Sequence, residues 1–263
     1  MRVMLALVAV GCGRIGFGAR TDATSDAVGV EIDAARPRCN DPAVPPPTLT
    51  ISGTVFRYTS FTTTTPIPGA TATLVDGTAS EPSATANAQG AYSLSIPTHG
   101  APLPGKLAFT NTNDAAVFTT TVWLDGPLTR DLVGSPTTAY IVGPDAPVWN
   151  SGAMTLVYQS TGITEDAAAG SLNIEPVDCA GNGVAGVSVT VTPPPAQLGY
   201  IDMNGHPDPN ASATSDPFPV VFCANAVAGP THITFSGAGL RWPEIDLDVL
   251  AGSNNTVAVV RGD

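Results

Sequence analysis

Residues 91–97 read Ala-Tyr-Ser-Leu-Ser-Ile-Pro, and residues 70–74 read Ala-Thr-Ala-Thr-Leu. In both stretches an apolar residue alternates with a small hydroxyl-bearing one, which is the pattern of a strand with one buried and one exposed face. Threonine suits such a strand because its branched Cβ favours extended backbone while its hydroxyl group faces water. The alternation returns over 51–55, 187–191 and 245–249, so the sequence predicts an all-β protein.

The composition agrees with this prediction and excludes several classes of protein. The 263 residues include 27 Gly and 25 Pro, too many for a protein built from long helices. The 22 acidic residues outnumber the 10 Lys and Arg residues, giving a net charge of −12. No nucleic-acid partner is therefore expected, because general nucleic-acid binders neutralise phosphates with basic residues.

The first half of the chain carries a set of short motifs that resembles one family. In chain order they are Gly53-x-Val55, Pro68-Gly69-Ala70-x-Ala72-x-Leu74, Ala84-Thr85 and Gly90-x-Tyr92-x-Leu94-x-Ile96-Pro97. The set resembles a carboxypeptidase regulatory-like domain. The resemblance implies a small transthyretin-like, Ig-like β-sandwich over residues 48–134, with the Pro-Gly and Gly-x-Tyr segments forming its turns.

A weaker version of the pattern returns over residues 171–263. Residues 184–191 parallel the Pro-Gly strand motif, and residues 218–222 take the place of the Gly-x-Tyr strand. This stretch departs from the family where Asp216-Pro217 stands for the expected Gly turn. We therefore expect a second, divergent sandwich, so that the chain holds two small sandwiches in tandem.

The segment between the two predicted sandwiches, residues 135–170, is expected to be a connector. Asp145 followed closely by Pro147 supplies the residue types of a helix start. Apolar residues then recur on one helical face. The sequence therefore predicts one short connecting helix near residues 146–159.

The N-terminus indicates export. Residues 1–12 join a single Arg to an unbroken apolar run and a small residue, which is the order of a secretory signal. The segment Ala9-Val10-Gly11-Cys12 resembles a bacterial lipobox, and the resemblance implies that the chain is cut before Cys12 and anchored to a membrane by a lipid on that cysteine. Residues 13–47 are acidic, end in Pro45-Pro46-Pro47, and are predicted to form a disordered tether.

The remaining three cysteines are expected to include one disulfide. Cys179 and Cys223 lie in the same predicted sandwich, and an exported compartment permits a bond between them. Cys39, in the predicted tether, would then be free or pair between chains. No C-x-x-C spacing is present, and zinc is not expected.

The sequence predicts no catalytic residue and no cofactor. His99, His206 and His232 stand far apart without the spacing of a metal-ligand set. A weak calcium-loop candidate remains, because Asp202, Asn204 and Asp208 offer oxygens at alternate spacing. Asn-Gly within this loop is also an ordinary turn signal, and turn chemistry is the favoured interpretation.

The leading hypothesis is a non-enzymatic lipoprotein of the outer membrane or cell surface, with an unknown protein or polysaccharide partner. Its loops are the candidate binding faces, because rigid sandwiches carry function on loops. Those considered are Tyr58–Ile67, Thr110–Ala116 and Gln197–Asn210. The alternatives are a secreted soluble protein, a calcium-binding, iron-binding or enzymatic variant of the sandwich, and an accessory subunit of an exported peptidase or transporter.

Overall fold

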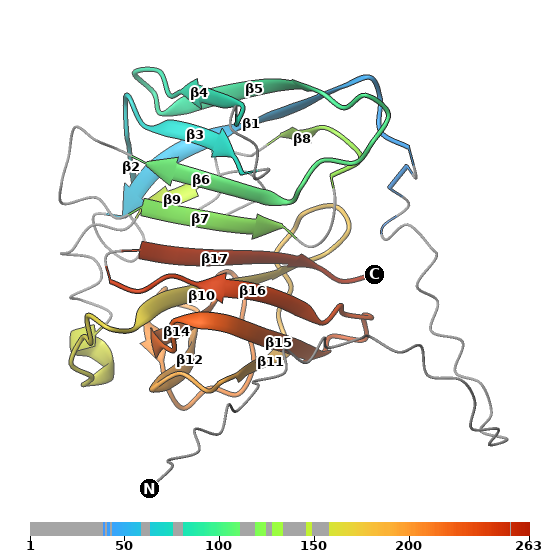
Figure 1. Ribbon diagram of the computed structural model, residues 1–263. Coiled ribbons are helices and arrows are strands. Elements are labelled where there is room, and N and C mark those ends of the chain that lie inside the picture. Colours follow the sequence, from blue (N-terminus) through green and yellow to red (C-terminus); the bar gives the residue numbers. More distant parts are fainter. Residues whose placement is uncertain are drawn as a thin grey trace, which may run out of the picture. The chain divides into compact units, whose positions relative to one another are not determined.

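The computed structural model describes residues 39, 41–42, 44–58, 64–75, 81–110, 119–124, 128–133, 146–148, 158–252 and 254–263 (Figure 1). These residues belong to the unit Pro37–Asp263. Apart from one turn of helix, its regular elements are strands, which confirms the all-β prediction.

The strands of the first half form two layers. They are β1 (Thr48–Tyr58), β2 (Thr64–Pro66), β3 (Thr71–Leu74), β4 (Ser83–Thr85), β5 (Ala91–Pro97), β6 (Lys106–Thr110), β7 (Thr119–Leu124), β8 (Leu132–Val133) and β9 (Ala146–Val148). One layer has the order β2-β1-β5, with β8 and β9 running parallel to β1. The other layer, β7-β6-β3-β4, is part of a nine-stranded sheet.

The second half supplies the remaining strands. They are β10 (Gly170–Val177), β11 (Val187–Thr192), β12 (Gln197–Ile201), β13 (Pro207–Asp208), β14 (Val221–Ala226), β15 (Gly229–Gly237), β16 (Ile245–Val249) and β17 (Asn254–Arg261). The nine-stranded sheet has the order β13-β12-β14-β10-β17-β7-β6-β3-β4. A three-stranded sheet, β11-β15-β16, faces it across the second core.

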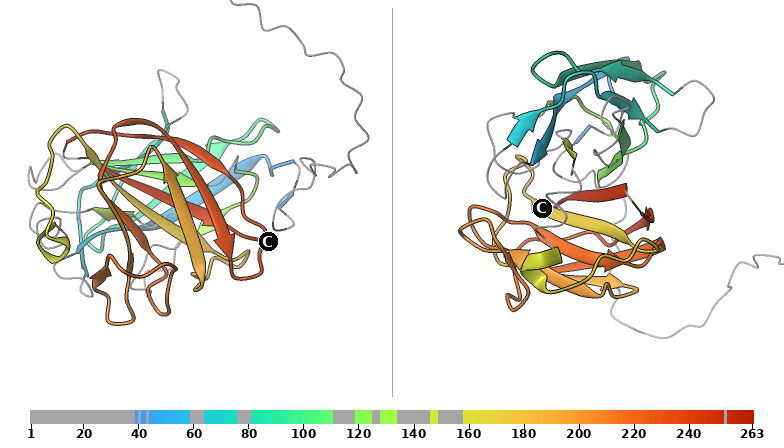
Figure 2. Two further views of the ribbon diagram at one scale, coloured as in Figure 1. Left: turned by 90° about the horizontal axis from the view of Figure 1, so that it is seen from below. Right: turned by 90° about the vertical axis from the view of Figure 1, so that its left-hand side faces the viewer.

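One strand links the two halves of the chain. β17 lies between β10 and β7 and runs parallel to both, so a single sheet passes through the stretches predicted as separate sandwiches. Val257 and Val259 on one face of β17 belong to the first hydrophobic cluster, whereas Ala258 and Val260 on the other face belong to the second. A strand that is buried on both faces reads as a continuous apolar run, and residues 257–260 do so. The views in Figure 2 show this red strand between the blue-green and the orange strands.

The alternation that predicted the strands is present in the structure. Side chains along β5 alternate between buried and exposed from Tyr92 onward, and those along β3 alternate between buried and half-buried. The turn before β5 depends on Gly90, whose φ is 73°. A Cβ atom at this position would lie 2.4 Å from the carbonyl oxygen of Val55. Gly90 therefore allows the hairpin to approach β1 closely.

The predicted helix near 146–159 is wrong in its first part. Residues 146–148 form β9, which pairs with residues 55–57 of β1. Strand pairing has overridden the capping signal of Asp145 and Pro147, because local propensity is weaker than a ladder beside a core strand. The helix observed spans residues 158–161, and its Tyr158 is buried against Ala224. Asp145 and residues 149–157 lie outside the described part of the chain.

Candidate functional site

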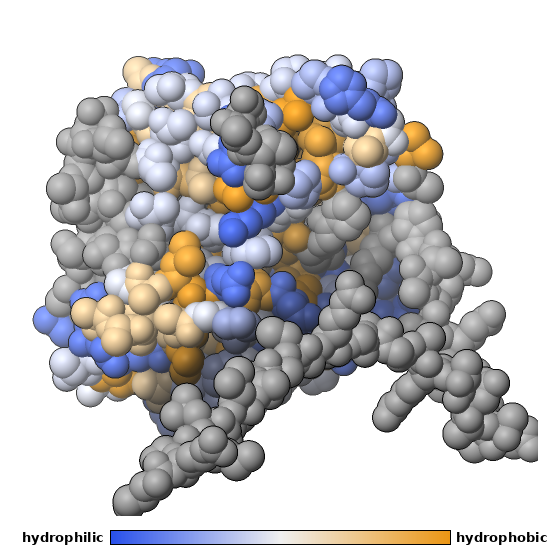
Figure 3. All heavy atoms as spheres, in the orientation of Figure 1, coloured by the Kyte–Doolittle hydropathy of each residue, from blue (hydrophilic) through white to orange (hydrophobic). Residues whose placement is uncertain are grey.

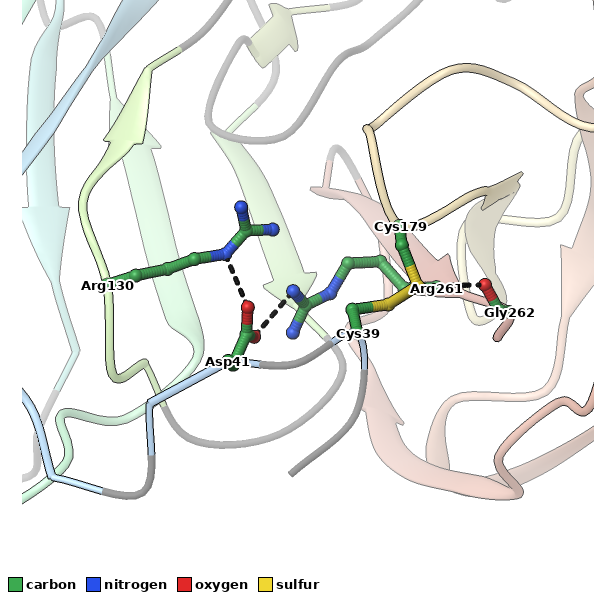
Figure 4. Close-up of polar contacts among 6 residues, drawn as sticks. All are labelled: Cys39, Asp41, Arg130, Cys179, Arg261 and Gly262. Atoms are coloured by element: carbon green, nitrogen blue, oxygen red, sulfur yellow. Dashed lines mark hydrogen bonds and ion pairs between the residues drawn. A yellow bond between two sulfur atoms is a disulfide. The ribbon is translucent and has the colours of Figure 1, made fainter. Parts of the chain in front are cut away.

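The start of the described chain is fastened to the second half by a disulfide. Cys39 is bonded to Cys179, and their Cα atoms are 5.0 Å apart, within the usual range for such bonds. Cys179 follows β10 by two residues, so the bond joins the N-terminal segment to the central region of the nine-stranded sheet (Figure 4).

The predicted bond between Cys179 and Cys223 is therefore wrong. Cys223 is a free, buried thiol in β14, opposite Leu172 of β10, and it belongs to the second core. Burial raises the pKa of this thiol, so it stays protonated. The cysteine assigned to the disordered tether is the true partner, because the chain before β1 passes the ends of β10 and β17.

A carboxylate two residues beyond the disulfide reinforces the attachment. Asp41 Oδ1 lies 2.7 Å from Arg130 Nε, and Asp41 Oδ2 accepts a hydrogen bond of 2.6 Å from Arg261 Nη1 (Figure 4). The side chains of Asp41 and Arg261 are only 12% and 16% exposed, whereas Arg130 is 40% exposed. The pair with Arg261 is therefore the better shielded from water and contributes more. We call Cys39, Asp41, Arg130, Cys179 and Arg261 the clasp.

The chain remains attached between the clasp and β1. Pro45 is buried. The Thr98 hydroxyl donates a hydrogen bond of 2.6 Å to the carbonyl of Pro46, and the Thr98 amide donates one of 3.0 Å to the carbonyl of Pro47. The prediction of a disordered tether up to residue 47 therefore does not hold for residues 39, 41–42 and 44–47. Residues 13–38 lie outside the described part of the chain.

The end of the chain forms the other side of the clasp. The Gly262 amide donates to the carbonyl of Val177, and its carbonyl oxygen lies 3.5 Å from the sulfur of Cys179. Asp263 exchanges two backbone hydrogen bonds with Arg241, and its carboxylate accepts a third from that guanidinium at 3.1 Å. Three segments that are distant in sequence thus meet where the central strands β10 and β17 end.

Asp178, which precedes Cys179, holds the turn that places this cysteine. Its Oδ1 atom accepts 2.8 Å hydrogen bonds from the amides of Ala180 and Asn182, and Asn182 adds a side-chain bond. Desolvation raises the pKa of Asp178, but these hydrogen bonds outweigh it and leave the pKa below its ordinary value. The charged form of Asp178 therefore stabilises the turn.

The calcium-loop candidate has the geometry of a similar turn. Asp202 Oδ1 accepts 2.8 Å hydrogen bonds from the amides of Asn204 and His206. Asp208 Oδ1 accepts a hydrogen bond of 2.8 Å from the amide of Asn210, which follows the end of β13. The bond from His206 contributes most to a lowered pKa of Asp202. Within the described ranges, no group of three or more His, Cys, Asp or Glu side chains is placed to hold a metal ion.

The other predicted site residues are only partly described. Cys12 lies outside the described residues, as do residues 59–63 of the loop Tyr58–Ile67 and residues 111–116 of the loop Thr110–Ala116. The loop Gln197–Asn210 is described and consists mainly of β12, the Asp202 turn and β13. Among the described residues, no helix is long and apolar enough to cross a membrane.

Sequence reasoning missed most of the clasp. Asp41, Arg130 and Arg261 lie far apart in the sequence, and no motif connects them. One signal was available at Cys179, where Asp178 and the Gly181-Asn182-Gly183 run indicate a tight turn that fixes the cysteine.

Comparisons with known proteins give only weak structural similarities. No protein-family profile and no curated protein matches the chain. The Bacillus anthracis TIE protein is 10% identical with a TM-score of 0.26, over 82% of this chain and 34% of that one. This chain therefore spans about a third of the length of that protein.

Two pilins give similar values. A double mutant of the shaft pilin SpaA from Lactobacillus rhamnosus GG is 11% identical, with a TM-score of 0.25 over 82% of this chain and 98% of that one. The minor pilin GBS52 of Streptococcus agalactiae is 12% identical, with a TM-score of 0.25 over 81% and 95%. Function is therefore argued below from the residues and contacts of this chain.

Proposed function

We propose that this protein is an exported, non-enzymatic component of the cell envelope, anchored by a lipid on Cys12, whose β-sandwich fold serves a binding or structural role. The outer membrane or cell surface is the proposed location. The observation that carries the proposal is the disulfide between Cys39 and Cys179.

The disulfide supports export because such bonds form and persist in oxidising compartments and are rare in the reducing cytosol. The signal-like run that ends at Cys12 supports the same conclusion independently. The two observations lie on different parts of the chain and concern different chemistry.

The position of the clasp supports an anchored arrangement. In this proposal, residues 13–38 connect the lipid to the clasp, and the clasp attaches the segment before β1 to the ends of the central strands β10 and β17. Two kinds of contact, a covalent bond and a shielded ion pair, hold the same short segment. Such reinforcement is useful in a segment that connects a folded unit to a membrane anchor.

The anchor is tested by metabolic labelling with an alkyne-bearing fatty acid, followed by membrane fractionation. We expect the wild-type chain to take up the label and to sediment with membranes, and the Cys12→Ser variant to lose both properties. Cys223→Ser is the matched control, because its thiol is buried and outside the clasp. A Cys12→Ser variant that still carries the label would contradict the anchor.

The role of the folded unit is tested by crosslinking on intact envelopes and affinity isolation of the mature form. A protein or polysaccharide recovered with wild type but not from Cys12→Ser envelopes supports an anchored binding module. Elemental analysis of the purified protein tests the alternatives, because stoichiometric calcium or iron would favour a metal-binding or enzymatic variant instead.

A further inference from the structure

The strand β16 has a free edge. It ends the order β11-β15-β16, and residues 245–249 pair with β15 on one side only. Among the described strands, none is paired with the other edge of β16. The exposed backbone donors and acceptors of an end strand form a template on which another extended chain can pair.

A groove lies along this free edge. It consists of two adjoining hollows of about 410 and 450 Å³, and Trp123, Asp246 and Leu247 line both of them. The first hollow continues to Lys106 on β6, and the second continues to Pro193 after β11. The first hollow therefore lies between β16 and residues of β6 and β7, whereas the second extends from β16 past Thr231 and His232 of β15 toward the end of β11.

The two walls of the groove differ in chemistry. One wall is the half-buried indole of Trp123, which packs against the second core and carries Lys106 Nζ at 4.5 Å from its ring centroid. The other wall is β16, from which Asp246 and Asp248 project outward while Leu247 points into the core. Figure 3 shows hydrophilic and apolar residues side by side across the middle of this face.

The carboxylates on this wall are accessible. Glu244 is 73% exposed and Asp246 is 87% exposed. Together with Asp248 they occupy alternate positions along the chain, so their spacing follows the period of two that governs side chains along a strand. His232 on β15 contacts one of these carboxylates, with its Nδ1 atom 2.9 Å from Asp246 Oδ1.

We propose that the free edge of β16 binds an extended peptide segment in which basic residues alternate with apolar residues. The segment would add a fourth strand to the sheet β11-β15-β16. Its basic side chains would lie opposite Glu244, Asp246 and Asp248, and its apolar side chains would face Trp123. Backbone hydrogen bonds to β16 provide the affinity in such an arrangement, and the alternating pockets provide the selectivity.

A second copy of this chain does not fit the groove equally well. Pairing β16 with β16 would bring the same carboxylates together, and like charges directly opposite each other destabilise a strand pair. The chain also holds a single lysine, Lys106, which is part of the groove wall itself. The charge of the edge therefore favours a basic segment from another molecule.

The inference goes beyond the proposed anchor and is tested without it. The full chain with Cys12→Ser is titrated against a fluorescent nine-residue peptide of alternating lysine and valine, at low salt and at physiological salt. Two control peptides accompany it. One carries N-methyl groups on its valines, which removes backbone donors, and the other has glutamate in place of lysine.

We expect the lysine peptide to bind at both salt concentrations, and the N-methylated and glutamate peptides to bind at least tenfold more weakly. The double variant Asp246→Asn and Asp248→Asn should weaken binding at least tenfold. The matched double variant Glu165→Gln and Asp216→Asn removes two exposed acids elsewhere and should leave binding unchanged. All four substitutions are at exposed positions, and thermal melting confirms that each variant folds.

A structural readout completes the test. Hydrogen exchange should slow at the amides of β16 when the lysine peptide is bound. Binding of the N-methylated peptide with equal affinity would overturn the inference, because it would show attraction between charges without strand pairing. Equal losses in the two double variants, no binding of any peptide, or no protection of β16 would overturn it as well.

Discussion

Breaking the disulfide between Cys39 and Cys179 should cause a large loss of stability. The two cysteines are separated by 140 residues. In the chain-entropy model, closing a loop of that length lowers the entropy of the unfolded chain by about 17 cal/mol/K, or about 5 kcal/mol at 25 °C. We therefore expect Cys39→Ser and Cys179→Ser each to reduce the free energy of unfolding by up to about 5 kcal/mol, a large part of the total for a typical domain.

The assay is equilibrium unfolding in guanidinium chloride under non-reducing conditions, with the wild-type chain measured again after reduction. The two serine variants and the reduced wild type should have the same midpoint, because each lacks the same covalent bond. Cys223→Ala is the control. Its thiol is free, so we expect a loss of only about 1 kcal/mol, from reduced packing in the core.

This comparison also decides between the two pairings. A bond between Cys179 and Cys223 would make Cys223→Ala as damaging as Cys179→Ser and would leave Cys39→Ser harmless. That pattern of midpoints would refute the reasoning, and mass spectrometry of non-reduced peptides would then identify the bond directly.

Three further predictions concern single side chains. Asp41→Asn should lower the free energy of unfolding by about 2 kcal/mol, because it removes the negative charge that the shielded Arg261 guanidinium contacts. Arg130→Gln should cost less than about 1 kcal/mol, because that ion pair is more exposed. Equal losses in denaturant titrations would show that shielding does not matter here. Asp202→Ala should destabilise the protein at neutral pH but not near pH 2. The pKa of Asp202 is lowered below 3.8 in the folded protein, so its charged form stabilises the fold above that pH, and this effect is lost as pH falls through the folded pKa. A constant difference in melting temperature across pH would contradict this. Gly100→Ala, at φ 79° and with open space around the added Cβ, should lower the free energy of unfolding by about 1 kcal/mol. Gly90→Ala should lower it by about 2 kcal/mol more, because its Cβ would meet the carbonyl oxygen of Val55. Similar losses in the two variants would exclude the close contact as the cause.

The strands were predictable because their signal is local. Alternation over 70–74 and 91–97 reports which side chains are buried, and the structure has those faces. Which strands pair with each other cannot be predicted from the local sequence. The parallel pairing of β17 with β7 joins residues about 135 positions apart, and no period or turn signal in the sequence indicates such a neighbour.

The clasp was unpredictable for a related reason. With three cysteines besides Cys12, three pairings are available, and sequence alone does not choose among them. Proximity along the chain favoured Cys179 and Cys223, but one points into a core and the other lies beyond the end of a strand. The fold brings Cys39 close because the segment before β1 passes the ends of β10 and β17.

The central position of β17 also matters for the order in which the chain can fold. β17 is the last of the described strands to leave the ribosome, yet Val257 and Val259 complete the first core and Ala258 and Val260 complete the second. Neither half can complete its core until β17 has been synthesised. A chain that crosses a membrane in unfolded form benefits from this order, because the arrangement delays compaction until the strand that joins both cores has also been delivered.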